Sequence, residues 1–209
     1  MGLTIWGRSN SVNVMKVLWC LAELDIGHER IDAGMQFGKN NEPEYLAMNP
    51  NGRVPTLVDG DFVLWESNSV MRYLCMAYGK GTPIYPQAPK QRAAVDRWLD
   101  WTLSTVQPVD RPVFWALVRT PKEKQDMAQI QKDADAEAPV WAIADRQLST
   151  RRYIEGEAFT IADIAVAAFA RRWLGFTGIN QPSFPHVERW YKDVASRPSF
   201  AKQLAVPMS

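Results

Sequence analysis

The chain is poor in the residue types that most often carry metal, acid–base or disulfide chemistry. Its 209 residues include only two histidines and two cysteines. Neither histidine has a companion at catalytic or metal-binding spacing, which argues against a histidine-activated nucleophile. Cys20 and Cys75 each lie in an apolar helical pattern and form no CxxC pair, so we expect two reduced thiols in the core and no metal site.

An excess of charge of either sign is also missing. The net charge is +1, with acids and bases interspersed, and this argues against a nucleic-acid-binding surface. No apolar run is as long as the roughly 20 residues of a membrane-spanning helix, and the N-terminus lacks the charged-then-apolar pattern of a signal peptide. We therefore expect a cytoplasmic protein that contacts neither nucleic acid nor membrane.

The apolar content of 46% is enough for one large domain or two small ones, and the two halves of the chain follow different patterns. Residues 1–78 alternate between strand and helix signals in the order βαβαββα, in which Asp59-Gly60 marks a hairpin. Residues 79–90 contain three prolines and two glycines, which is typical of a linker. Residues 91–209 carry only helical spacing, so the predicted fold is α/β followed by all-α.

The individual elements follow from the same signals. Strands are expected at residues 3–6 and 28–32 and on both arms of 55–65, and helices at 12–24, 42–48, 67–78, 92–107, 123–148, 160–173 and 186–196. The stretch QPVDRP, residues 107–112, is expected to break the helical pattern just before Phe114 and Trp115. Thr160 and Asp163 have the spacing of a capping box flanked by an apolar staple, and we interpret this motif as structural.

The loop NPNGRVP, residues 49–55, leads into a strand. A cis bond between Val54 and Pro55 would turn the backbone N–H and C=O of Val54 away from the sheet, where an extended peptide-like ligand could pair with them. General frequencies favour the trans form, so the loop taken alone is interpreted as a plain turn.

The dipeptide Glu66-Ser67 ends the hairpin and opens a helix. We expect Ser67 to be the N-cap of that helix, which by itself explains the residue. A helix N-terminus also attracts a carboxylate, and an acidic neighbour can pair with an ammonium group. Together the two residues could hold both ends of a free α-amino acid group.

The first strand-to-helix turn carries an unusual number of hydroxyl and amide groups. Ser9, Ser11 and Asn13 lie between an apolar strand and an apolar helix. At least one of them is expected to cap the helix. The turn therefore offers uncharged hydrogen-bond donors at a helix N-terminus.

Five segments are informative together, in the sequence order NPNGRVPTL, the DGD hairpin, WESNSVMRYL, FTIADI and HVERWYKDVASRPSF. They resemble the corresponding segments of a cytosolic glutathione transferase, and the resemblance covers essentially the whole chain. It implies a thioredoxin-like βαβαββα domain, residues 1–78, joined by the linker 79–90 to an all-helical domain, residues 91–209. It further implies glutathione as co-substrate, no metal, and a homodimer in which the α/β half of one subunit contacts the helical half of the other.

The resemblance also assigns contacts to the tripeptide. Its binding residues are expected to be Asn40, Lys39, Arg53, Val54, Pro55, Glu66 and Ser67. Val54, before a cis-Pro55, should pair with the cysteinyl backbone, while Ser67 should bind the γ-glutamyl carboxylate. Glu66 should face the glutamyl ammonium, and the polar residues at positions 39, 40 and 53 should lie at the glycine end.

In this family the first turn faces the glutathione sulfur. Ser11 matches the serine of the theta- and phi-like branches, and its hydroxyl should donate to the thiolate. Stabilising the charged form lowers the pKa of the thiol, and a decrease of ~2 units corresponds to roughly 2.7 kcal/mol. Asn13 matches the asparagine of a branch with a Thr/Asn pair, and Ser9 lies near the position of the cysteine in other relatives, so both remain alternatives.

The leading hypothesis is conjugation of glutathione to a small hydrophobic electrophile. The acceptor pocket is expected between the domains, lined by Phe114, Trp115 and Trp173. A second hypothesis keeps glutathione but changes the reaction to disulfide or peroxide reduction by a Ser11/Asn13 pair. A third is a non-catalytic binding or interaction module, although such members often lose the Glu-Ser pair or the small polar turn that this chain retains.

Overall fold

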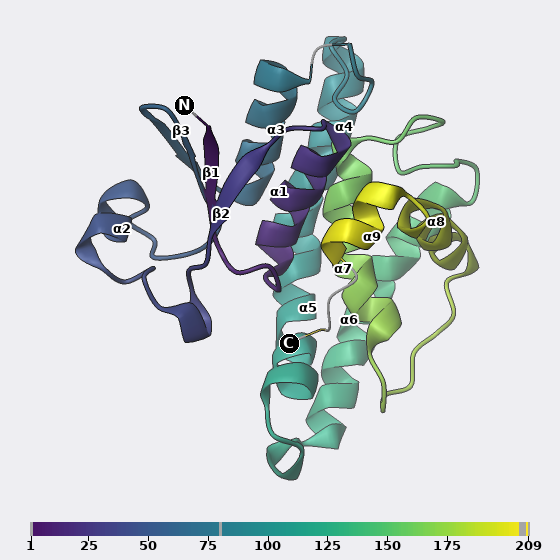
Figure 1. Cartoon of the computed structure of the whole chain (residues 1–209). Coiled ribbons are helices and arrows are strands. Elements are labelled where there is room, and N and C mark those ends of the chain that lie inside the picture. Colours follow the sequence, from purple (N-terminus) through teal and green to yellow (C-terminus); the bar gives the residue numbers. More distant parts are fainter. Residues whose placement is uncertain (1, 80, 205–207, 209) are drawn as a thin grey trace. The chain divides into compact units, whose positions relative to one another are not determined.

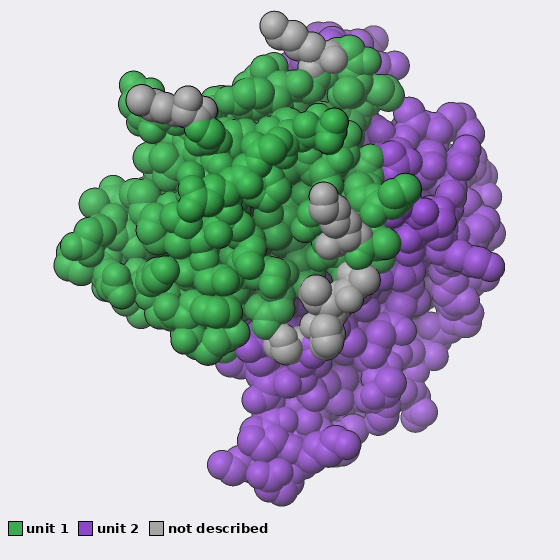
Figure 2. All heavy atoms as spheres, viewed as in Figure 1, with its two compact units in different colours: residues 1–85, 198–206 green, residues 86–197, 207–209 purple. Residues whose placement is uncertain are grey.

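The computed structural model describes residues 2–79, 81–204 and 208. The chain forms two compact units, shown in separate colours in Figure 2. Unit 1 consists of residues 1–85 and 198–206, and unit 2 of residues 86–197 and 207–209. The last helix, α9 (Pro198–Leu204), thus belongs to unit 1 although it follows unit 2 in the sequence. The domain bounds given above stay predictions.

Unit 1 contains a four-stranded mixed sheet. The strands are β1 (Leu3–Trp6), β2 (His28–Ile31), β3 (Thr56–Asp59) and β4 (Phe62–Trp65), in the spatial order β2-β1-β3-β4. The helices are α1 (Val12–Glu23), α2 (Pro43–Met48) and α3 (Ser67–Tyr78), with a short 3₁₀ turn, η1, at Met35–Phe37. β1 and β2 are parallel, and the other pairs are antiparallel. The predicted βαβαββα order is confirmed.

The sheet has helices on both faces. Figure 1 shows α1 and α3 on one side of it and α2 on the other. Every side chain of α1 from Val14 to Leu21 is buried, which explains the nearly continuous apolar run in this part of the sequence. Cys20 and Cys75 are free thiols in the contact between α1 and α3, as predicted.

In the described part of unit 2 the regular elements are all helices, joined by loops that hold one isolated bridge between Tyr153 and Gly156, and this confirms the all-α prediction. Its α-helices are α4 (Pro89–Trp101), α5 (Gln107–Phe114), α6 (Met127–Leu148), α7 (Ile161–Gly175) and α8 (Pro185–Ala195). Two π-helical segments, η2 (Thr102–Val106) and η3 (Trp115–Arg119), flank α5, and a 3₁₀ turn, η4 (Lys122–Lys124), precedes α6.

The prediction that residues 107–112 break the helix is wrong. Both prolines of this stretch lie in α5, with Pro108 in its first turn and Pro112 in its interior. Proline removes one N–H and crowds the carbonyl of the preceding turn. The wider π-helical turns on either side of α5 accommodate such a defect without ending the helix.

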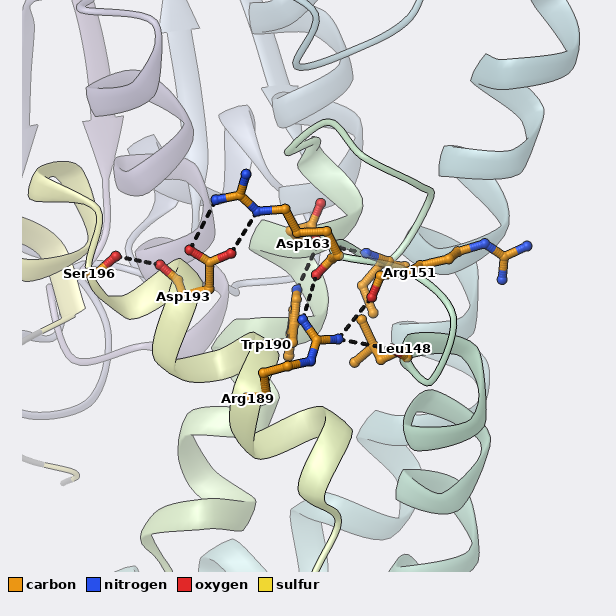
Figure 3. Close-up of polar contacts among 9 residues, drawn as sticks. Leu148, Arg151, Asp163, Arg189, Trp190, Asp193 and Ser196 are labelled. Atoms are coloured by element: carbon orange, nitrogen blue, oxygen red, sulfur yellow. Dashed lines mark hydrogen bonds and ion pairs between the residues drawn. The ribbon is translucent and has the colours of Figure 1, made fainter.

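The capping box at the start of α7 is confirmed. Asp163 is fully buried, and its carboxylate accepts hydrogen bonds from the backbone N–H of Thr160 and Ile154, both at 2.9 Å. Figure 3 shows Trp190 donating its indole N–H to the same carboxylate, at 2.8 Å. Arg189, on α8, donates to the carbonyls of Leu148 and Arg151 in the same view. One acidic side chain therefore ties the start of α7 to α8 and to the preceding loop.

A second buried carboxylate cluster lies in unit 2. Asp110 accepts from Arg172 Nη1 at 2.5 Å, and Glu137 accepts from Trp141 Nε1 at 2.8 Å. The other oxygen of each carboxyl group, Asp110 Oδ1 and Glu137 Oε2, is buried without a hydrogen-bond partner. Burial and the Asp110 charge raise the pKa of Glu137 to about 8, so Glu137 holds a proton at neutral pH.

We expect the Glu137→Gln variant to be less sensitive to alkaline pH than the wild type. Between the ordinary pKa of 4.5 and the folded value of about 8, the folded chain holds a proton on Glu137 that the unfolded chain has released. The free energy of unfolding of the wild type therefore falls as the pH rises through this window. Glutamine keeps the shape but does not titrate, and thermal melts at about pH 5.5 and about pH 8.5 measure the difference.

The matched control for this prediction is Glu123→Gln, which removes an exposed carboxylate from the same unit. Its melting temperature should fall between the two pH values as much as that of the wild type. Asp163, whose pKa burial raises to about 6, contributes equally to all three proteins. An equal fall in E137Q and the wild type would contradict a protonated Glu137.

Candidate functional site

The first turn places Ser11 at the N-cap position of α1. Gly7 allows the turn to pack closely on the helix, because a Cβ on this residue would lie 2.5 Å from Val14 Cγ2. The backbone C=O of Ser11 accepts from Met15 N at 2.8 Å, as an N-cap should. Its hydroxyl, however, makes no capping hydrogen bond. Ser11 is only 7% exposed, and its hydroxyl has no hydrogen-bond partner in the described part of the chain.

The same turn is linked to the start of α3. Asn13 Oδ1 accepts a hydrogen bond from Ser67 Oγ at 3.4 Å, so two candidate residues from the first turns of α1 and α3 meet. Ser9 is half-buried in the turn before Ser11. The structure therefore brings Ser11, Asn13 and Ser67 to neighbouring helix N-termini within unit 1.

The N-cap prediction for Ser67 is wrong. The helix begins at Ser67, and Glu66 precedes it at the N-cap position with φ of +69° and no side-chain capping bond. A non-glycine residue in this region is uncommon and is typical of functional turns. Glu66 is exposed, while Ser67 is buried among the first residues of α3, where free backbone N–H groups favour an anion.

The loop before β3 holds Val54 in an unusual setting. The Val54–Pro55 bond is cis. Two side chains fix the preceding residue, because Tyr45 Oη and Asn49 Nδ2 donate to the carbonyl oxygen of Arg53 at 2.6 and 2.8 Å. No backbone hydrogen bond of Val54 is found among the described residues, which leaves its N–H and C=O available to a ligand.

The candidates for the glycine end differ in what their side chains do. Asn40 Nδ2 donates to the carbonyl oxygen of Gly52 at 2.7 Å, so this amide supports the loop that carries Arg53. Lys39 adopts φ of +65° and is exposed, with its ammonium 6.0 Å from the centroid of the Trp6 ring. Lys39 and Arg53 thus present the exposed cations, and Asn40 has a structural contact.

The three predicted acceptor residues all lie in unit 2, in different surroundings. Trp115 is 45% exposed, while Phe114 and Trp173 are 5% and 1% exposed. Trp173 stacks on Trp141 with ring centroids 6.3 Å apart, and the Arg172 guanidinium lies 3.6 Å from the Phe114 ring centroid. The structure does not gather the three side chains on one surface, and their acceptor role stays a prediction.

Unit 2 also has a cavity of about 490 Å³ that is not lined by any of these three residues and was not anticipated from the sequence. Its lining is mixed: the apolar side chains are Leu117, Val118, Met127, Phe176 and Met208, and the polar ones are Lys122, Gln125 and Thr177. The apolar pair Leu117-Val118, which follows Trp115 after one alanine, is a sequence signal for it. Its volume is within the range of small-molecule sites.

Within residues 2–79, 81–204 and 208, no three histidine, cysteine or acidic side chains are grouped so that they could hold a metal ion. In that same part of the chain, no helix combines the length and the apolarity needed to cross a membrane.

Comparisons with known proteins point to a single family. The family models of the glutathione S-transferase N-terminal and C-terminal domains match residues 1–75 and 107–198. Glutathione S-transferase GstB of Escherichia coli is 39% identical over 99% of this chain and 100% of its own length. Glutathione S-transferase 3 of Zea mays is 31% identical, covering 97% of this chain and 93% of that protein.

The structural comparison gives the same family. The theta class glutathione S-transferase of Xanthomonas axonopodis pv. citri, solved with glutathione bound, superimposes with a TM-score of 0.94 and 42% identity. That match covers 100% of this chain and 99% of the solved chain. Poplar glutathione transferase F1 matches 98% of this chain and 97% of its own with a TM-score of 0.87 at 26% identity.

Proposed function

Because this chain belongs to the glutathione S-transferase family, we propose that it binds glutathione in unit 1 and conjugates its thiolate to small hydrophobic electrophiles. The observation that carries this proposal is the Ser11 hydroxyl, which lies at the N-terminus of α1 and has no hydrogen-bond partner among the described residues. It can donate to a sulfur anion without giving up a capping bond. The glutathione-bound relative supports the choice of ligand.

The chemistry assigned to the first turn is stabilisation of the thiolate. A free thiol has a pKa near ~8.5 and is only a few per cent ionised at pH 7. A hydrogen bond from Ser11 and the α1 backbone N–H groups favour the charged form and lower that pKa. A decrease of ~2 units makes the bound thiol mostly thiolate, the species that attacks an electrophilic carbon.

The rest of the tripeptide is assigned to the other two loops. Val54 offers an N–H and a C=O to the cysteinyl backbone in the manner of an added strand. Ser67 and the first N–H groups of α3 bind the γ-glutamyl carboxylate, and Glu66 pairs with the glutamyl ammonium. Arg53 and Lys39 attract the glycine carboxylate. For the electrophile we propose the 490 Å³ cavity, whose apolar side chains would contact a hydrophobic acceptor.

Two assays test this function. Calorimetric titration with glutathione should give a saturable heat, and its absence would favour the non-catalytic module. Turnover of an aryl halide should then exceed turnover of a model disulfide. A preference for the disulfide would instead support reduction by a Ser11/Asn13 pair, an arrangement in which the Asn13 oxygen is already engaged by Ser67.

We also propose the homodimer implied by the family, because two surface features are complementary. On unit 1, an aromatic and acidic patch consists of Phe62, Tyr73, Tyr78 and Asp59, in which both tyrosines donate to the Asp59 carboxylate at 2.6 and 2.5 Å. On unit 2, a cavity of about 700 Å³ between α4 and α6 combines aromatic and cationic side chains, Trp98, Trp101, Arg97, Arg146 and Arg151. Each patch fits the opposite unit of a second copy.

The Phe62→Arg variant should shift the protein from dimer to monomer. Phe62 is 42% exposed, so the fold should tolerate arginine, while the added cation would face the arginines of the partner's cavity. Size-exclusion chromatography with light scattering at micromolar concentration measures the mass. Leu46→Arg is the control, since Leu46 is 38% exposed on the same unit but outside the patch. A dimer that survives F62R would exclude this patch from the interface.

A further inference from the structure

Lys16 is a fully buried cation in α1, close to the residues assigned to glutathione. Its side chain is 0% exposed, whereas lysine is almost never fully buried unless it is paired. The ammonium Nζ donates to Asn68 Oδ1 at 3.0 Å, and Asn68 is itself only 1% exposed. Asn68 directly follows Ser67, so this hydrogen bond reaches the turn that begins α3.

Lys16 belongs to a stripe of α1 that contacts α3 at three levels. Positions 13, 16 and 20 are three and four residues apart and therefore lie on one helix face. Asn13 meets Ser67 at 3.4 Å, Lys16 meets Asn68 at 3.0 Å, and Cys20 meets Cys75 with 3.8 Å between the sulfur atoms. The two polar contacts lie toward the N-terminal ends of α1 and α3, near Ser11 and Ser67. The thiol contact lies farther along both helices.

We propose that Lys16 and Asn68 are positioning residues, which hold the carboxylate-binding start of α3 in register with the sulfur-binding start of α1. This inference rests on the proposed function, because it assigns a role to the spacing between two glutathione contacts. A buried charge-assisted hydrogen bond is short and directional, and it is costly to leave unmade. It therefore fixes the spacing more tightly than an apolar contact, which tolerates sliding.

Fixing that spacing matters because glutathione is bound at both ends at once. If α3 moves relative to α1, the γ-glutamyl carboxylate and the sulfur cannot both keep their best contacts. The ligand then binds with one contact weakened, and the sulfur shifts relative to the Ser11 hydroxyl. The expected signature is a higher KM for glutathione together with a raised pKa of the bound thiol.

The Lys16→Met and Asn68→Ala variants test the proposal. Each is expected to raise the KM for glutathione about tenfold, equivalent to about 1.4 kcal/mol, with a smaller change in kcat measured at alkaline pH. The pH profile of kcat/KM should shift to higher pH in both variants. The double variant should add little to either single change, because each substitution alone already removes the Lys16–Asn68 hydrogen bond to which the role is assigned.

Cys75→Ala is the matched control, because it removes a contact between the same two helices away from the site. It should lower the melting temperature while leaving the KM for glutathione and the pH profile unchanged. The inference is overturned if K16M and N68A keep the wild-type KM, or if C75A raises it equally. If K16M fails to fold, N68A still tests the proposal.

Calorimetry of the wild type separates this inference from the proposed function. Where the wild type binds glutathione but the variants bind it equally well, only the positioning role fails. A wild type that gives no heat with glutathione overturns the proposed function, and the positioning role with it.

Discussion

The Ser11→Ala variant is expected to lose about 25-fold in conjugation rate at pH 7 and to recover most of that loss at about pH 9. If the hydroxyl lowers the pKa of the bound thiol from ~8.5 to ~6.5, the thiolate fraction at pH 7 falls from about three quarters to a few per cent when the hydroxyl is removed. At about pH 9 both proteins hold mostly thiolate, so their rates converge. The pH profile of kcat/KM with an aryl halide measures both effects.

Two neighbouring variants serve as controls for this result. Ser9→Ala removes a hydroxyl from the same turn and should leave the profile unchanged. Asn13→Ala removes the acceptor of the Ser67 hydrogen bond, so it should raise the KM for glutathione more than it changes the thiol pKa. If the Ser11→Ala enzyme kept the wild-type pH profile, Ser11 would not be the donor, and another group in the turn would have that role.

Local signals were sufficient for most of the fold. The Asp59-Gly60 hairpin and the Thr160–Asp163 capping box each depend on residues close in sequence, and both are present in the structure. The prolines of residues 107–112 led to a wrong prediction, because the π-helical segments on either side of α5 accommodate them. The prolines themselves give no sign of those segments. Helix α9 was not predicted, because a segment of seven residues is too short for its helical spacing to be distinguished from a loop.

The candidate site was predictable where a residue type matches its chemistry. Ser11, Asn13 and Ser67 are small polar residues at helix starts, and the structure brings them together. Lys16 was not identified, because a lysine in an apolar helical run is ordinarily expected to reach solvent. Its contact with Asn68 spans 52 residues and becomes visible only when α1 and α3 are packed. The 490 Å³ cavity was missed for the same reason, since its lining comes from distant segments.

The Asp163→Ala variant is expected to be destabilised by about 3–5 kcal/mol, the largest effect on stability that we anticipate. The carboxylate accepts from the backbone N–H of Ile154 and Thr160 and from the Trp190 indole, and all of these donors are buried around it. Alanine leaves each of them without a partner and with no access to water, which costs far more than the loss of one average hydrogen bond. Urea denaturation followed by tryptophan fluorescence measures the free energy of unfolding.

Asp126 supplies the comparison that isolates burial as the cause. Its carboxylate also caps a helix N-terminus: Asp126 is the N-cap residue of α6, whereas Asp163 is the third residue of α7, in its capping box. Asp126 accepts from the backbone N–H of Ala128 and Gln129, both at 3.1 Å. This cap is exposed, so water replaces the carboxylate in an Asp126→Ala variant, and the expected loss is only about 1 kcal/mol. If the two variants lost equal stability, capping alone would explain Asp163, and its buried bonds to Ile154 and Trp190 would contribute nothing measurable.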